Sequence, residues 1–218
     1  MTAFASGWFD PRQVKIFGLC TGAGSIAFPL TYLLTDVITE VYGYKNARRA
    51  VLAGLLFLSI FIFYGQFVIH FLSPLSPNKT TLPLFLHASN QIIVASLASY
   101  LVTETVNPFI VAKLKISFQG RFMAFRFIIA TFAAYIVDEL TYAPIAFYGV
   151  MNMHNFIFHV LDSWVFMISI ELLLLPLSIR IAKYLKTVEK TDIYDDKTKF
   201  NIFSFNNFYR KSDNHYKN

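Results

Sequence analysis

The chain has 218 residues, of which 56% are hydrophobic and only 15% are charged. A soluble domain carries about 25% charged residues, so this composition excludes an ordinary soluble protein and favours one embedded in lipid. The net charge of +6 does not indicate nucleic-acid binding, because the basic residues lie between apolar runs and in the C-terminal tail, as in the cytoplasmic loops of membrane proteins.

Five apolar stretches are long enough to cross the bilayer, which requires a helix of about 20 residues. They comprise residues 17–41, 50–72, 91–114, 122–147 and 156–182. Barrel strands are excluded, because the stretches are too long and show no alternation. The sequence therefore predicts an all-α fold, a polytopic membrane helix bundle with five full transmembrane helices.

The transmembrane domain is predicted to comprise residues 1–186, followed by a polar C-terminal tail, residues 187–218. The tail alternates charged residues with Tyr and Phe and has no sustained period. We expect it to be disordered or to lie on the membrane surface.

The connections between helices sort by charge. Of 19 Lys and Arg residues, 15 lie in two connections on one side of the membrane or from Arg180 onward, and three lie on the other side. The positive-inside rule then makes the C-terminus cytoplasmic. The N-terminus would lie outside, so residues 1–9 are interpreted as the remnant of a truncated first helix. Gly18 and Gly22 would form a small-residue face for that helix or for a neighbouring one.

Ionisable residues occur inside the predicted helices, where each costs about 2.5–3.5 kcal/mol on insertion. Asp36, Glu104 and Asp138 are the deepest, and at least two of them are predicted to line one polar cavity. Glu40 lies near a helix end, where it would be solvated or face the cavity.

Two further ionisable residues leave alternatives open. Arg126 begins the fourth predicted helix, where it would either face the cavity or extend to lipid phosphates. Glu171 is in the middle of the last helix, and it would either pair with Arg126 or be protonated.

Prolines and histidines add little to the functional prediction. Four predicted helices contain an internal proline, as broken transporter helices do, although prolines are common in membrane helices. They are Pro29, Pro108, Pro144 and Pro176. The five His residues and the single Cys20 show no metal-ligand spacing, and no phosphate-binding loop is present. No enzyme activity, metal or cofactor is predicted.

Residues 28–49, FPLTYLLTDVITEVYGYKNARR, resemble the signature of the queuosine-precursor transporter family, also called the vitamin-uptake-like family. Two later segments, 95–115 and 126–147, are similar to the family in the same order, and the resemblance covers about residues 16–186. It implies a six-helix protein of the bacterial inner membrane that imports a 7-deazaguanine-type base for the tRNA nucleoside queuosine. The implied partners are this small molecule and the bilayer, with a homo-oligomer left open and no nucleic acid.

The predicted substrate-binding residues combine positions that match the family with polar residues in the same helices. Those matching the family are Phe28, Tyr32, Asp36, Glu40, Arg126 and Asp138. Those departing from it are Glu104, Asn107, Tyr135 and Glu139. Phe166, where relatives often have Lys, also departs from the family but is not a predicted binding residue.

The chemistry agrees with a guanine-like substrate, because a carboxylate accepts two parallel bonds from its N–H and NH₂ edge, and aromatic rings stack on its face. Asp36 or Asp138 is the predicted acceptor, and Phe28, Tyr32 or Tyr135 the stacking surface. Tyr32 and Tyr135 precede Asp36 and Asp138 in helices of opposite direction, as in an inverted repeat, or by chance. The departures leave two alternatives: uptake of another planar vitamin or nucleobase, and a non-transporting membrane subunit of a larger complex.

Overall fold

The computed structural model describes residues 13–16, 18–26, 28–71, 81–147, 153–201 and 208–216. Its helices are α2 (Phe28–Tyr42), α3 (Tyr44–Phe71), α4 (Thr81–Ser117), α5 (Met123–Phe147) and α6 (Met153–Glu189). A short antiparallel hairpin, β1 (Gln13–Ile16) and β2 (Leu19–Gly22), precedes them with the 3-10 turn η1 (Ala23–Ile26). A second 3-10 turn, η2 (Lys211–Asp213), lies in the tail. The predicted all-α bundle is confirmed.

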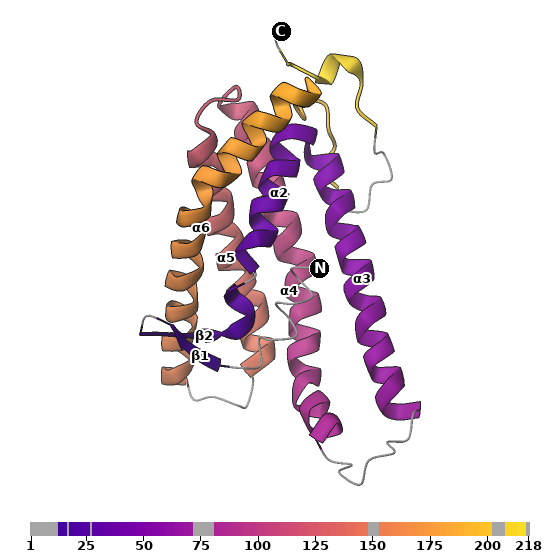
Figure 1. The fold of residues 1–218 in the computed structure, drawn as a ribbon, viewed down its shortest axis with the longest axis vertical. Coiled ribbons are helices and arrows are strands. Elements are labelled where there is room, and N and C mark those ends of the chain that lie inside the picture. The colour runs from indigo at the N-terminus through magenta and orange to yellow at the C-terminus, as the bar shows by residue number, and fades with distance from the viewer. Residues whose placement is uncertain are drawn as a thin grey trace.

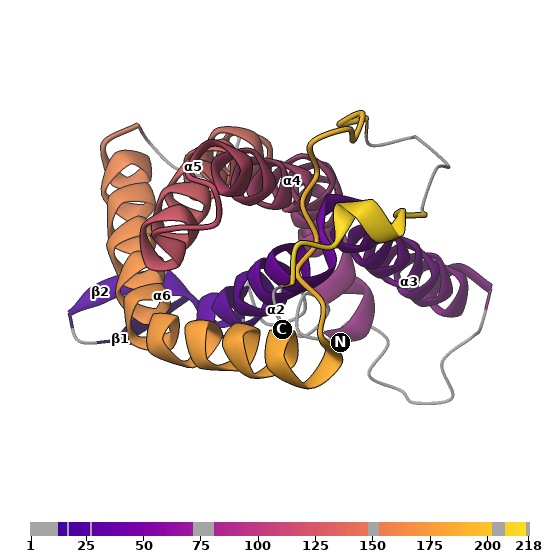
Figure 2. The ribbon, with the colours of Figure 1, turned by 90° about the horizontal axis from the view of Figure 1, so that it is seen from above.

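Four of the helices form a ring. Helix α2 packs on α4 and α6, and α5 closes the ring by packing on the same two helices, while α3 packs outside the ring on α2 and α4. Figure 1 shows the bundle from the side, and Figure 2, viewed along it, shows α2, α4, α5 and α6 around a common centre. Side chains on the inner faces of these four helices therefore point toward one another.

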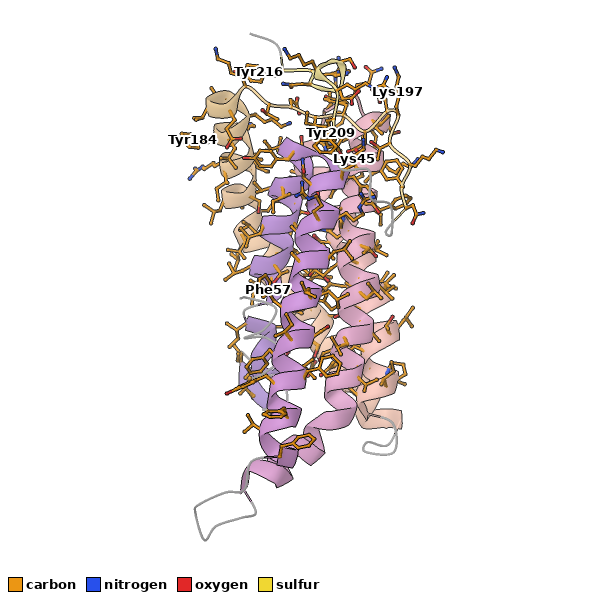
Figure 3. All side chains as sticks on the ribbon, turned by 90° about the vertical axis from the view of Figure 1, so that its right-hand side faces the viewer. Lys45, Phe57, Tyr184, Lys197, Tyr209 and Tyr216 are labelled. Carbon is orange, nitrogen blue, oxygen red and sulfur yellow. The ribbon has the colours of Figure 1, made fainter. Side chains whose placement is uncertain are left out.

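The distribution of polarity is that of a membrane protein. Large apolar side chains are exposed along α3, for example Phe57 at 71% and Phe63 at 74%, and Figure 3 shows Phe57 midway along this helix. Charged and amide side chains such as Asp36, Glu104 and Asn107 are fully buried instead. This arrangement is stable where the surrounding solvent is lipid and the polar groups face the inside of the bundle.

Within the part of the chain that the structure describes, three helices are long and apolar enough to cross a membrane, with spans at Tyr44–Gly65, Val94–Ser117 and Val160–Glu189. Helix α5 has 25 residues, which is also sufficient in length, but it carries Arg126, Asp138 and Glu139. Helix α2 has 15 residues and rises only about 22 Å, so it does not cross the hydrocarbon by itself.

The prediction of one helix over residues 17–41 is wrong in its first part. The hairpin strands occupy Gln13–Ile16 and Leu19–Gly22, and Gly18 lies in the turn at φ +91°, a conformation that glycine adopts without steric cost. Pro29 then lies in the first turn of α2, where a backbone N–H would have no partner within the helix and its absence costs nothing. Gly18 and Gly22 consequently do not form a helical packing face, and Pro29 is not an internal proline, whereas Pro108, Pro144 and Pro176 are.

The remnant helix predicted at residues 1–9 lies outside the described residues. Helix α5 agrees with the predicted range 122–147 to within one residue, whereas α3, α4 and α6 extend beyond their predicted bounds at one end or both. The largest differences are at the start of α4, at residue 81, and at the end of α6, at residue 189. Helices α2 and α3 are separated by Gly43 alone, at φ +80°, which ends α2 with the left-handed residue typical of a helix C-terminus.

The described part of the tail packs on the end of the bundle where α2 and α3 meet. This differs from the expected disorder, whereas the alternative, that the tail lies on the membrane surface, stays a prediction. The backbone N–H of Ile193 donates to Val41 O at 3.1 Å, and that of Tyr44 donates to Asp195 Oδ2 at 2.9 Å. Tyr209 donates to Asp195 Oδ1 at 2.6 Å and accepts from Lys45 N at 2.8 Å. Burial and the neighbouring Asp195 carboxylate raise the pKa of Tyr209, which keeps it a hydrogen-bond donor. Figure 3 shows Lys45 and Tyr209 together at this end, called the tail end below.

Candidate functional site

An aromatic cluster lies between α2, α5 and α6. The rings of Tyr32 and Tyr135 meet edge to face, with centroids 4.9 Å apart, and Phe28 packs edge to face on Tyr32 at 5.4 Å. Met167 of α6 closes the cluster. Both tyrosine hydroxyls are buried without a hydrogen-bond partner among the described residues. The cluster therefore offers both ring surface and unused polar groups.

Next to this cluster, α2 and α4 each carry a carboxyl group in which only one of the two oxygens accepts a hydrogen bond. Asp36 accepts from Asn107 Nδ2 at 2.7 Å through Oδ1, and Glu104 accepts from Thr35 at 3.3 Å through Oε2. Asp36 Oδ2, Glu104 Oε1 and Asn107 Oδ1 have no hydrogen-bond partner among the described residues. Since leaving a buried polar atom unpaired costs about 1–3 kcal/mol, three such acceptors together indicate a site for a ligand that donates hydrogen bonds.

Asp138 reaches the same helix from the other side of the ring. It accepts from Thr103 at 3.3 Å and also from Ser99, both on α4. Thr103 and Asn107 are one helical turn apart on one face, so Asp36 and Asp138 contact consecutive turns of α4. The structure thus brings Asp36 and Asp138, two of the three acids predicted for the cavity, to one side of α4. Glu139 is half-buried and one residue further on, about 100° around the helix from Asp138.

Glu171 adds a third unpaired carboxyl group that was not among the predicted binding residues. It is 3% exposed, and neither oxygen has a hydrogen-bond partner among the described residues. It interacts electrostatically with Asp36, Tyr32 and Tyr135. Its position as an acid in the middle of a membrane helix was the available signal.

Glu40 and Arg126, predicted as substrate-binding residues, lie one layer closer to the tail end. Arg126 donates through Nη1 and Nη2 to the two oxygens of Glu40, at 2.5 and 3.0 Å, and both side chains are 0% exposed. Lys186 also donates to Glu40, at 2.6 Å. Both carboxylate oxygens of Glu40 are therefore occupied. This pairing replaces the alternatives of a solvated Glu40, an Arg126 extended to lipid phosphates, and an Arg126–Glu171 pair.

The tail completes this ion network. Asp192 bridges Lys115 at 2.6 Å and Lys186 at 2.8 Å, and Lys115 also donates to the backbone carbonyls of Glu40 and Ile193. Two acids and three bases from α2, α4, α5, α6 and the tail are thus joined in one cluster. Such a network fixes the four helix ends relative to one another.

No group of three or more His, Cys, Asp or Glu side chains in the described part of the chain is arranged to hold a metal ion. The arrangement instead suits an organic ligand. Unpaired acceptors on α2 and α4 would bind a polar edge, and the aromatic cluster would contact a flat face.

The fold and the site together define the class of this protein. It is a helical membrane bundle with a polar, aromatic-lined site inside a ring of four helices. The chain belongs to the putative vitamin uptake transporter family, whose model matches residues 22–181. It is also similar to a protein of Bacillus subtilis (strain 168) described as a probable queuosine precursor transporter, at 22% identity over 183 residues, covering 83% of this chain and 80% of the relative. No solved structure gives a match. The family resemblance predicted from residues 28–49 is confirmed, and the chain is a membrane transporter for a vitamin-like substrate.

Proposed function

We propose that this protein imports a 7-deazaguanine-type base, a queuosine precursor, across the bacterial inner membrane. The observation that carries the proposal is the pair of half-used carboxyl groups, Asp36 and Glu104, beside the Tyr32–Tyr135 aromatic pair. The description of the Bacillus subtilis relative supports the same substrate class.

A guanine-like ligand would supply the hydrogen-bond donors that the unpaired acceptors of the site lack. A guanine-like base presents a ring N–H and an exocyclic NH₂ side by side, and each would donate to an unpaired oxygen of Asp36 or Glu104. Base–aromatic stacking contributes about 1–3 kcal/mol per base in nucleic-acid complexes. Tyr32, Tyr135 and Phe28 supply that surface. A bound base would thereby satisfy buried acceptors that otherwise destabilise the bundle.

Glu40 and Arg126 are assigned a different role in this proposal. Because Arg126 and Lys186 already occupy the Glu40 carboxylate, these residues hold the tail end closed rather than contact the base. The predominance of basic residues at that end supports a cytoplasmic location for the C-terminus.

The experiment is complementation in a bacterium that neither makes nor imports queuosine precursors. Cells expressing the protein are supplied with the base, and both uptake of labelled base and queuosine in tRNA are measured. We expect both signals to appear with the wild type and to be lost with Asp36→Asn, which keeps the shape and removes the charge. Asp196→Asn, an exposed tail acid, is the matched control and should transport normally. Wild-type uptake by Asp36→Asn would remove Asp36 from the mechanism.

A second candidate, uptake of another planar vitamin or nucleobase, is favoured by the residues that depart from the family pattern. Phe166 is buried in α6, at a position where the family resemblance implies Lys, and the buried carboxyl group of α4 is at Glu104, where the resemblance implies Gln. Competition of unlabelled purines, pterins and flavins against the labelled base distinguishes the two candidates. Absence of uptake of any such compound, with normal insertion, would favour a non-transporting subunit instead.

A further inference from the structure

Glu171 points into the ring. Met167, one turn before it on α6, packs against Tyr32 and Tyr135, and Leu174, one turn or so after it, packs with Leu33 and Val37 of α2. Residues three or four apart share a helix face, so Glu171 lies on the inward face between these contacts. Its burial at 3% exposure and its electrostatic interactions with Asp36 and both tyrosines agree with this direction.

The carboxyl groups around Glu171 form no ion pair among the described residues. The hydrogen bonds of Asp36 and Glu104 come from an amide and a hydroxyl, and Glu171 receives none from the described residues. The buried bases Arg126 and Lys115 are held one layer away, at Glu40 and Asp192. The carboxyl groups of Asp36, Glu104 and Glu171 therefore lie near the aromatic pair without a described ion pair to any of them.

We propose that Glu171 is a specificity-determining residue that binds a primary ammonium group of the substrate, so that the transporter prefers a cationic planar base over a neutral base of the same shape. This inference rests on the proposed function and narrows its substrate class. Asp36 and Glu104, on α2 and α4, take the hydrogen-bonding edge of the base, and Glu171, on α6, takes the amine.

The chemistry of an ammonium group fits this corner of the site. It carries three N–H donors and no acceptor, so it can use both free oxygens of Glu171 and a neighbouring tyrosine hydroxyl. Tyrosine rings also attract cations within about 6 Å of their centres. A neutral substituent such as a nitrile brings no positive charge, so Glu171 would either be charged without a counter-ion in a buried site, which is unfavourable, or would first have to be protonated.

The test compares two 7-deazaguanines that differ only at one substituent, an aminomethyl group in the first and a nitrile in the second. Their affinities for the purified full chain in lipid nanodiscs are measured near pH 7, where an alkyl amine is protonated. We expect the wild type to bind the aminomethyl base about tenfold or more tightly than the nitrile base, the range expected for a charge-assisted hydrogen bond. Glu171→Gln should remove this preference and leave the affinity for the nitrile base within about threefold of the wild type, since that bond is absent there.

Two further variants serve as controls. Glu189→Gln makes the same substitution on the same helix, outside the site at the Tyr42 contact, and should keep the wild-type preference. Glu171→Asp retains the charge and should keep a preference for the aminomethyl base.

The outcomes separate this inference from the proposed function. Equal affinity of the wild type for the two bases, or an undiminished preference in Glu171→Gln, would overturn the role of Glu171 while leaving base import intact. If Glu171→Gln does not fold, the wild-type ratio and that of Glu171→Asp decide. Failure of the wild type to bind either base would refute the proposed function itself.

Discussion

The pair formed by Glu40 and Arg126 can be tested by a double-mutant cycle with Glu40→Gln, Arg126→Met and the combination. Both side chains are fully buried and joined by two hydrogen bonds, and Lys186 adds a third to the same carboxylate. Removing one partner of a buried ion pair costs about 3–5 kcal/mol, because the remaining charge is left uncompensated. Arg126→Met should be the costlier single change, since Arg126 also donates to the carbonyls of Gly120 and Arg121.

The double variant should be destabilised by less than the sum of the two singles, with a coupling of about 2–3 kcal/mol. The free energy of unfolding is measured in mixed detergent micelles from the loss of helical circular dichroism. Lys186→Met is the comparison, because Lys186 is partly exposed and shared with Asp192, and we expect it to cost less than Arg126→Met. If the effects of the two single substitutions are additive, or if each costs less than about 1 kcal/mol, the ion pair does not stabilise the fold.

Three further predictions concern the tail end and the topology. Gly43→Ala should destabilise the protein by at least about 1–2 kcal/mol, because Gly43 has φ +80° and a Cβ there would meet the Tyr209 hydroxyl at 2.5 Å; thermal unfolding measures this. Asp195→Asn should loosen the tail by weakening its bonds to Tyr44 N and Tyr209, and limited proteolysis should then cleave the tail faster than in the wild type. A reporter fused to the C-terminus should read cytoplasmic, and one inserted near Asn78 external; the reverse would overturn the positive-inside assignment.

The helices could be predicted from hydropathy because lipid imposes a length and a composition on each span. The error at residues 17–27 arose because a short apolar run does not distinguish a helix from a strand. Gly18 is typical of a hairpin turn and Pro29 of a helix start, so both residues indicated the true boundary. Inside an apolar stretch, however, glycine and proline are also common in membrane helices.

The acids of the site could be predicted because burial of a charge in a membrane helix is costly and needs a function. Their partners could not, because pairing depends on how helices far apart in the chain are rotated. Glu40 and Lys186 are separated by 146 residues, and Asp192 belongs to a segment with no periodic pattern. The sequence left Glu171 with two alternatives, pairing with Arg126 or protonation, and the structure excludes the first because Arg126 is bound to Glu40.

Asp36 and Glu40 are both buried acids of α2, and their different hydrogen-bond partners give them different roles. They lie one turn apart on the same face of α2 and are both fully buried. Arg126 cannot serve Asp36 as well, because its Nε and Nη2 groups are also held by the carbonyls of Arg121 and Gly120, where α4 turns into α5. The guanidinium is therefore fixed at the level of Glu40, and Asp36 receives only an amide donor. The turn between α4 and α5 therefore holds Arg126 beside Glu40 and leaves the Asp36 carboxyl group available to a ligand.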